Sequence, residues 1–255
     1  METEPILAHA TVQAYRVLCE FCSALLVESP SEELIDQLID QRSLLLEEPF
    51  ASVAPDASSA LYGVLERVDA QGKDDFVTEV KRDYTYLFYM VGASRTSPFE
   101  SVYRTDDRTM FGPTTLQVRE SYHAWGVEVP QLGNKPDDHI GYEFAFLTHV
   151  LGCAADALAA EDDGAADEVG RDVRAVGETD AEKEAFRASD AVRSFLSDHL
   201  LVFAPTYFAN MKTRAHEPFY RAVADISLST LLSLAQALGA KPTDEIDEAA
   251  YRLAE

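Results

Sequence analysis

The chain has 255 residues, of which 47% are apolar, and its 45 acidic and 21 basic side chains give a formal net charge of −24. This length and apolar content suffice for one large domain or two small ones, each with its own core. A charge this negative repels nucleic acid and anionic lipid, so neither is an expected partner. Cationic partners, or life at high salt, fit the charge better.

The acid-rich, lysine-poor composition is similar to that of proteins from salt-accumulating halophiles, in which most surface charge serves solvation. Cys19 and Cys22 form a single CxxC within an apolar helical pattern, without the second pair that a zinc ribbon needs. We therefore expect buried, reduced thiols in a cytosolic compartment. Residues 1–5 lack the basic start of a signal peptide, and no apolar run is long enough to span a bilayer. A cytoplasmic protein without membrane insertion is predicted.

Apolar residues at helical spacing predict helices over residues 5–28, from Ser31 to the residue before Pro49, over 57–71 and over 74–90. Ser31 is expected to cap the second of these helices. The fourth ends in an unusually aromatic turn from Tyr84 to Tyr89. Taken alone, such a turn is more often part of a core than of a binding site.

Residues 92–113 interrupt the helical pattern with glycine, proline and aspartate. A loop of about 20 residues is longer than compact domains usually carry without a function. Its apolar centre, from Phe99 to Tyr103, contains one carboxylate, so we expect it to form part of a binding surface. Thr114 is expected to cap the next helix, which ends at Gly126.

The stretch from Lys135 to Leu147 is typical of a helix start, because Asp137 or Asp138 can accept the first backbone N–H groups. His139 and Glu143 are four residues apart and share a helix face beside an apolar stripe. Acidic groups and a histidine next to a core-facing surface predict part of a pocket. Its expected ligand is a peptide that is both cationic and apolar.

Beyond residue 158 the composition becomes acidic and poor in large apolar side chains, which predicts a hinge or linker over 159–184. Helical patterns resume over 184–211 and 217–238. We predict an all-α fold of about ten helices, because no alternating strand pattern persists. Its regions are an N-terminal helical region (1–158), the acidic linker (159–184) and a C-terminal helical region (185–255).

Two residue pairs have the spacing of metal ligands, His139 with Glu143 and His149 with Cys153. They cannot share one ion, because about 15 Å of helix rise separates them. A nucleophile elbow and a phosphate-binding loop are both missing from the sequence. A metal-dependent hydrolase or oxidase using His139, Glu143 and His149 is one alternative function, and a general helical interaction domain is another.

Four short motifs follow one another in the first half: Tyr84-x-x-Leu87-Phe88, Pro98-x-Glu100-Ser101-x-Tyr103, Phe111-Gly112-Pro113-x-Thr115-Leu116 and Pro136-x-Asp138-His139-Ile140-x-x-Glu143-Phe144. The second half adds Ser197-Asp198-His199-Leu200-Leu201 before Pro205. Together they cover most of residues 10–238 and resemble the TorD/DmsD/NarJ family of redox-enzyme maturation chaperones. The most specific part is the fourth motif combined with the loop before it.

This resemblance implies an all-helical, cytoplasmic chaperone that is not an enzyme and has no cofactor of its own. Such chaperones bind the twin-arginine signal peptide, and sometimes the body, of a molybdopterin oxidoreductase of the dimethyl-sulfoxide-reductase type. They hold the apoenzyme back from export until its cofactor is loaded. The sequence leaves open the identity of the client, modulation by a nucleotide, and whether the chain is a monomer or a homodimer.

Carried over by motif, the implied peptide-binding positions are Tyr84, Leu87, Phe88, Glu100, Ser101, Gly112, Pro136, Asp138 and His139, and helical geometry adds Glu143. Two arginines suit bidentate carboxylates, whereas the apolar part of a leader suits an aromatic groove. We hypothesise that the groove consists of Tyr84, Leu87, Phe88 and residues 99–103. The arginines then face Asp138, Glu100 and Glu143, and His139 orients Asp138. Affinity should come mainly from apolar burial, at about 0.8 kcal/mol per CH₂ against about 0 to 1 kcal/mol per exposed ion pair.

Overall fold

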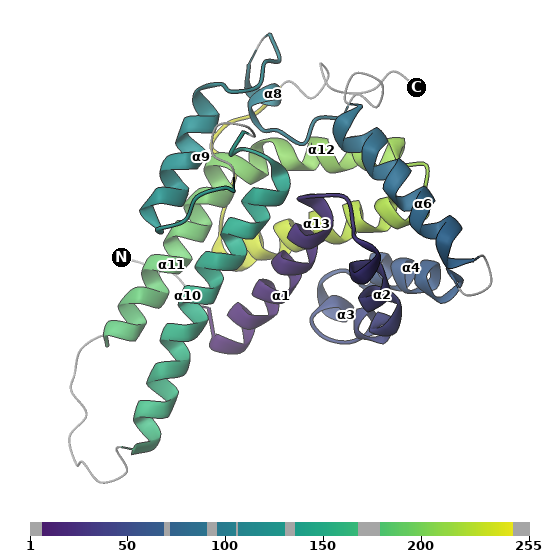
Figure 1. Cartoon of the computed structure of the whole chain (residues 1–255). Coiled ribbons are helices and arrows are strands. Elements are labelled where there is room, and N and C mark those ends of the chain that lie inside the picture. Colours follow the sequence, from purple (N-terminus) through teal and green to yellow (C-terminus); the bar gives the residue numbers. More distant parts are fainter. Residues whose placement is uncertain are drawn as a thin grey trace.

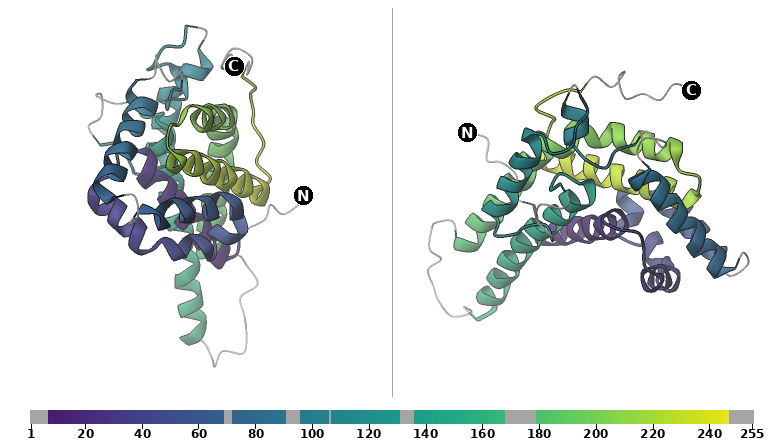
Figure 2. Two further views of the ribbon diagram at one scale, coloured as in Figure 1. Left: turned by 90° about the vertical axis from the view of Figure 1, so that its right-hand side faces the viewer. Right: turned by 45° about the horizontal axis from the view of Figure 1, so that its top comes forward.

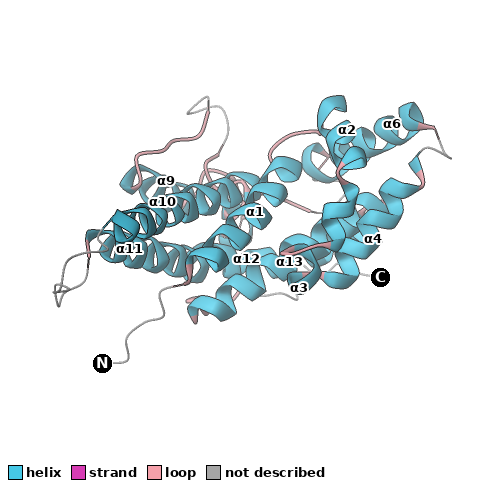
Figure 3. Cartoon of the chain, turned by 90° about the horizontal axis from the view of Figure 1, so that it is seen from below, coloured by secondary structure: helices cyan, strands magenta, loops and turns pink. Residues whose placement is uncertain are grey.

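The computed structural model describes residues 7–68, 72–90, 96–105, 107–130, 136–167 and 179–246. Every regular element in these ranges is helical, and one isolated β-bridge joins two loops (Figure 3). The predicted all-α fold is therefore confirmed.

The helices pack around one continuous core that includes residues from both ends of the chain. In chain order they are α1 (His9–Leu26), α2 (Glu32–Asp40), the 3₁₀ turn η1 (Arg42–Leu46), α3 (Phe50–Val53), α4 (Pro55–Glu66), α6 (Lys73–Tyr84), the π-helical turn η2 (Thr85–Tyr89), α8 (Ser101–Arg104), α9 (Pro113–Ala124), α10 (Ile140–Asp167), α11 (Asp180–Phe195), the π-helical turn η3 (Leu196–Leu200), α12 (Leu201–Arg214) and α13 (Pro218–Leu238).

Helix α1 lies near the middle of the molecule and packs against α10 and α13 (Figure 1). Its buried side chains recur at spacings of three and four residues, as on the inner face of an amphipathic helix: Val12, Tyr15, Leu18, Cys19, Cys22, Leu25 and Leu26. The two views of Figure 2 show the same central position from other sides. Burial of this stripe holds the N-terminal and C-terminal parts of the chain together.

Cys19 and Cys22 are buried and free, as predicted. Burial, together with the neighbouring Cys22, raises the pKa of Cys19 well above the usual range, and burial raises the pKa of Cys22 to about 12. Because only the thiolate is a strong nucleophile, these side chains act as core residues.

Helix α10 begins in direct contact with the backbone at the end of α1. A Cβ atom added to Gly141 would lie 2.6 Å from the backbone nitrogen of Val27 and 2.8 Å from the carbonyl carbon of Leu26. The hydroxyl of Ser23 donates a hydrogen bond to the carbonyl oxygen of Gly141, at 3.1 Å. Only glycine permits this approach, which places the segment before α10 over the end of α1.

The acidic range predicted as a linker is helical at both of its ends. Helix α10 continues to Asp167, and α11 begins at Asp180, after a capping box between Thr179 and Glu182. Residues 168–178 lie outside the described ranges. The two helices form a long antiparallel pair that extends to the lower left in Figure 1. The proposed division at 158 and 185 stays a prediction.

Three other local expectations differ from the structure. The second helix is capped by Ser31 as expected, but it ends at Asp40 and is followed by η1. Thr114 is not a cap, because α9 begins at Pro113 with Gly112 before it. The predicted loop 92–113 contains the short helix α8.

The apolar part of α10, Ile140–Ala160, is long and apolar enough to cross a membrane by length and composition. However, 50% of its most apolar window is buried inside the protein. The core helix of a soluble protein passes the same test, so this segment is weak evidence for membrane insertion.

Candidate functional site

Two loops that are far apart in the sequence meet in an antiparallel β-bridge between Phe99 and His139. The backbone N–H of Glu100 donates a hydrogen bond to the carbonyl oxygen of Asp138 at 3.0 Å. The backbone N–H of Ile140 donates one to the carbonyl oxygen of Pro98 at 2.7 Å. This bridge brings the loop motif around Glu100 against the motif that precedes α10.

The carboxylate of Asp138 is fully buried and holds two other elements in place. One of its oxygens accepts a hydrogen bond from the backbone N–H of Ser101 at 2.7 Å, and the other accepts from the hydroxyl of Thr115 at 3.0 Å. Asp138 therefore joins the start of α8 to the start of α9. It does not cap α10, because the ring Nδ1 of His139 accepts from the N–H of Gly141 at 3.1 Å instead.

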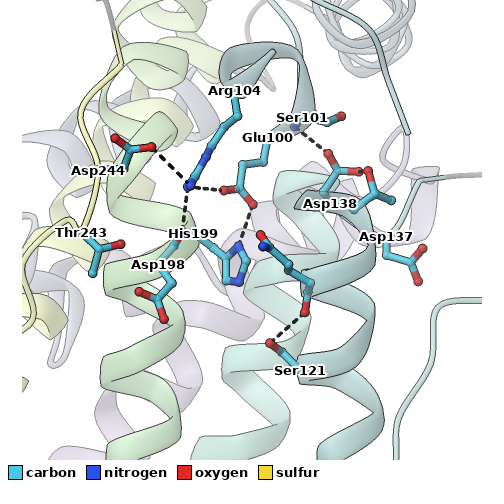
Figure 4. Close-up of polar contacts among 12 residues, drawn as sticks. Glu100, Ser101, Arg104, Ser121, Asp137, Asp138, Asp198, His199, Thr243 and Asp244 are labelled. Atoms are coloured by element: carbon cyan, nitrogen blue, oxygen red, sulfur yellow. Dashed lines mark hydrogen bonds and ion pairs between the residues drawn. The ribbon is translucent and has the colours of Figure 1, made fainter. Parts of the chain in front are cut away.

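Glu100 is also fully buried and binds two basic side chains (Figure 4). It accepts from His199 Nδ1 at 2.9 Å and from Arg104 at 3.1 Å. Arg104 in turn donates to the carbonyl oxygen of Asp198 at 2.8 Å and lies 3.5 Å from the carboxylate of Asp244. Burial raises the pKa of Glu100, while the hydrogen bond and charge of His199 and the charge of Arg104 oppose that rise.

Glu143 is buried with neither carboxyl oxygen hydrogen-bonded to any described residue. Burial raises its pKa well above the usual range, and the nearby charges of Glu100 and Asp138 raise it further. The charge of Arg104 partly opposes this rise. Burial without a hydrogen-bonding partner therefore favours the protonated form of Glu143, on the first turn of α10, over its carboxylate.

An open cavity of about 490 Å³ lies beside these buried groups. We call it the aromatic groove, and its lining comes from two sets of segments. The first set, at the end of α1, the α6–η2 junction and the start of α10, contributes Val27, Tyr84, Phe88, Tyr89, Pro136, His139 and Tyr142. The second, from α8 and the loops on either side of it, contributes Ser97, Phe99, Val102, Arg108, Met110 and Phe111.

Aromatic contacts shape the first side of the groove. The rings of Tyr84 and Phe88 stack with centroids 4.1 Å apart, and the Tyr84 hydroxyl donates to the carbonyl oxygen of Leu26 at 3.2 Å. The ring of His139 lies 6.1 Å from Phe88 and 5.2 Å from Phe99. Since the π-helical turn η2 follows Tyr84 directly, a wider helical turn presents Phe88 and Tyr89 to the groove.

The rim of the groove exposes large apolar side chains. Tyr89 is 66% exposed, Phe111 55% and Met110 50%. Grouped exposed apolar residues beside a cavity are typical of a binding surface and not of ordinary protein surface.

Residues 45–209, more than half of the chain, match the sequence model of the nitrate reductase delta subunit family. The chain belongs to this family. Two relatives are both named chaperone protein TorD. The Vibrio cholerae serotype O1 (strain ATCC 39541) protein is 26% identical over 159 residues, which are 62% of this chain and 62% of the relative. The protein from Shewanella sp. (strain ANA-3) is 24% identical over 151 residues, which are 58% of this chain and 70% of the relative.

The resemblance to the TorD/DmsD/NarJ family is thereby confirmed. The relatives are named as chaperones and not as enzymes, in agreement with the expectation that this member of the family is not an enzyme. The match covers 62% of the length of the Vibrio relative, so the activity and partners of this chain are given below as proposals.

The aromatic groove includes part of the residue set that the family motifs predict. Tyr84, Phe88, Pro136 and His139 line it. Leu87 is buried in the core, and Gly112 packs closely on α8, where an added Cβ would lie 3.3 Å from Thr105 Cγ2.

The carboxyl residues predicted to bind the peptide, together with Ser101, are buried and do not line the groove. Glu100, Ser101, Asp138 and Glu143 are completely buried and are not among the lining residues. The expected arrangement, with free carboxylates at the edge of the groove, is therefore not what the structure has. The sequence could not show this, because a motif does not distinguish a solvent-facing carboxylate from a buried one.

Several residues of the site were not predicted. Asp137 accepts two hydrogen bonds from Arg119, at 2.6 and 3.2 Å, and its carbonyl oxygen accepts from Tyr122. On the groove itself, Arg108, Met110 and Phe111 were missed. The adjacent Met110 and Phe111 in a polar loop were the available signal, since exposed apolar pairs in loops are uncommon.

The metal-ligand spacings are explained by other contacts. His139 caps α10, and His149 Nε2 lies 3.2 Å from the carbonyl oxygen of Trp125 and 3.8 Å from the sulfur of Cys153. Within the described ranges, no three His, Cys, Asp or Glu side chains are grouped to hold a metal ion.

Proposed function

We propose that this chain is a cytoplasmic maturation chaperone for a molybdopterin oxidoreductase of the dimethyl-sulfoxide-reductase type. In this proposal it binds the twin-arginine leader and the apo form of the client, assists cofactor insertion and delays export. Family membership and the two relatives named as TorD chaperones support the general class. The aromatic groove is the observation that carries the more specific claim.

The groove suits the apolar part of a leader. Its size falls in the range of ligand-binding cavities, and most of its lining residues are aromatic or aliphatic. Burying one large apolar side chain contributes about 1.5 to 3 kcal/mol, more than an exposed ion pair does. The acids behind the groove then act as positioning residues, because Asp138 and Glu100 hold the loops that form it.

Leader binding can be tested without disturbing the core. A labelled peptide with Arg-Arg before an apolar segment would be titrated against the wild type and Phe111→Ser, with fluorescence anisotropy as the readout. We expect about tenfold weaker binding or more, because one exposed aromatic contact is lost from the groove. Leu232→Ser is the matched control, since Leu232 is 50% exposed on α13 and is not a lining residue.

Equal affinity of Phe111→Ser and the wild type would place the leader elsewhere. Binding of a client lacking its leader as tightly as the complete apoenzyme would favour a general interaction domain instead. The maturation role requires a second measurement, the molybdenum content and exported fraction of a client expressed with and without this chain.

A further inference from the structure

The aromatic groove leaves large apolar side chains in contact with water when no client is bound. Tyr89, Met110 and Phe111, three of its lining residues, are each at least half exposed. Grouped apolar groups of this kind favour aggregation unless something covers them. A segment that occupies the groove between clients would remove this exposure.

The segment after α13 is fixed beside the helix that forms part of the groove. The backbone N–H and the hydroxyl of Thr243 both donate to the carbonyl oxygen of Ser197, at 2.9 and 3.2 Å. The carboxylate of Asp244 lies 3.5 Å from the guanidinium of Arg104, the last residue of α8 (Figure 4). We call residues 240–246 the C-terminal strap.

The end of the strap lies within reach of the groove. Helix α8 has four residues and is therefore about 6 Å long, and its Val102 lines the groove two positions before Arg104. Ile246, the last residue that the structure describes, packs against the core. The nine residues that follow, 247–255, have an extended reach of about 30 Å. This length is sufficient to connect the strap to the groove.

The sequence of residues 247–255 suits an apolar groove. An aromatic and an aliphatic side chain, Tyr251 and Leu253, flank Arg252, and three of the other positions are alanine. An arginine next to apolar side chains is also the composition of the proposed leader. The segment therefore offers the groove a short, weaker version of the same chemistry.

We propose that residues 247–255 occupy the aromatic groove of their own chain until a leader displaces them. Tyr251 and Leu253 are the side chains that contact the groove. This inference rests on the proposed function and adds to it a competitor carried by the chaperone itself. Because the strap holds one end of the segment, its effective concentration at the groove is about millimolar. An occupant of only millimolar affinity then covers the groove and still yields to a leader.

The first test compares leader binding by the wild type and by the complete chain carrying Tyr251→Ser with Leu253→Ser. A labelled peptide with Arg-Arg before an apolar segment is titrated against each, and fluorescence anisotropy is the readout. The double variant should bind the peptide about two- to tenfold more tightly, because its competitor is weakened.

Leu44→Ser with Phe186→Ser is the matched control for this titration. It also removes one aliphatic and one aromatic side chain, which are 48% and 43% exposed and lie outside the groove. This control should bind the peptide as the wild type does. Equal affinity of the wild type and the Tyr251 and Leu253 variant would overturn the proposed competition and leave leader binding intact.

The second test needs no leader. A photoreactive phenylalanine analogue in place of Tyr251 should label residues 84–89 or 108–111 of the same chain, as mapped by mass spectrometry. Labelling confined to other segments would overturn the proposal. Crosslinks that join an isotope-labelled copy to an unlabelled one would assign the groove to a second copy and overturn it as well.

The two tests separate this proposal from leader binding. Failure of the peptide to bind any of these proteins overturns leader binding, and the crosslink still decides whether the segment occupies the groove. Where the peptide binds, an excess of it should suppress the crosslink. A crosslink that persists at saturating peptide would show that segment and leader do not compete.

Discussion

Three buried carboxyl groups lie where the loop containing Phe99 contacts the start of α10, and they differ in their hydrogen-bonding partners. Asp138 accepts two hydrogen bonds from uncharged donors, and Glu100 is held by Arg104 and His199. Glu143 alone of the three has no hydrogen-bonding partner among the described residues. Leaving a buried charge unpaired is so unfavourable that the group protonates instead.

Glu143→Gln should make the free energy of unfolding less dependent on pH. The folded-state pKa of Glu143 lies above its unfolded value, so the folded protein keeps a proton that the unfolded chain releases. Wild-type stability therefore falls as pH rises from about 4.3, the unfolded pKa, towards the folded pKa, by about 1.4 kcal/mol per pH unit for this one proton. In urea unfolding between pH 5 and 8, the free energy of unfolding of the variant should rise relative to that of the wild type as pH increases.

Glu120→Gln on α9 is the matched control for this measurement, because Glu120 is exposed. A constant difference between Glu143→Gln and the wild type across this pH range would show that Glu143 is already ionised in the folded protein.

Between elements, the decisive contact is the crossing of α1 and α10 at Gly141. This close contact places the segment before α10 beside the end of α1. As a result Pro136 and His139 line the same groove as Val27 and Tyr84. The two π-helical turns have related effects, since η2 carries Phe88 and Tyr89 and η3 carries His199. Local departures from regular helix thus coincide with residues of the site, as is frequent for π-helical turns.

Gly141→Ala should destabilise the protein by about 1 to 3 kcal/mol, because its Cβ would overlap the backbone of Val27 and neither helix can move freely. Gly152→Ala is the matched control in the same helix, where the added Cβ would lie 3.6 Å from the Arg16 side chain. There we expect a gain of about 0.5 to 1 kcal/mol from helix propensity. Urea unfolding of both variants measures the difference, and an equal effect of the two would argue against the close crossing.

At the scale of the whole molecule, contacts join segments that are far apart in the sequence. Thr243, in the segment after α13, donates its N–H to the carbonyl oxygen of Ser197 at 2.9 Å, and Asp244 lies near Arg104. The same molecule carries a net charge of −24, most of it on exposed side chains. Self-repulsion of this size opposes the compact state at low ionic strength.

Salt should therefore stabilise the protein. The Debye length falls from about 30 Å at 0.01 M to about 3 Å at 1 M, so the melting temperature should rise over this range of sodium chloride. Thermal unfolding followed by circular dichroism checks this expectation. Repeating the series near the sequence pI of about 4.5, where the net charge vanishes, should largely abolish the rise. A melting temperature that falls with salt at neutral pH would show that attractive ion pairs dominate instead.

Much of the fold followed from local patterns. Apolar spacing located α1, α6 and α13 approximately, because the inner face of a helix repeats every three to four residues whatever it packs against. Ser31 was correctly identified as a cap, since its side chain acts within its own turn. The acidic composition of 159–184 did not indicate that α10 continues to Asp167 or that α11 begins at Asp180, because charged residues favour solvent exposure but do not prevent helix formation.

The motifs were sufficient to select the family, and four of the positions that they name, Tyr84, Phe88, Pro136 and His139, line the aromatic groove. Whether the carboxylates of Glu100 and Asp138 faced solvent depended on tertiary packing, since their partners come from other elements. His199 is 99 positions from Glu100, and Ser101 is 37 positions from Asp138. Residue type and spacing report what a side chain can do chemically, whereas burial and partnership arise only when distant helices pack together.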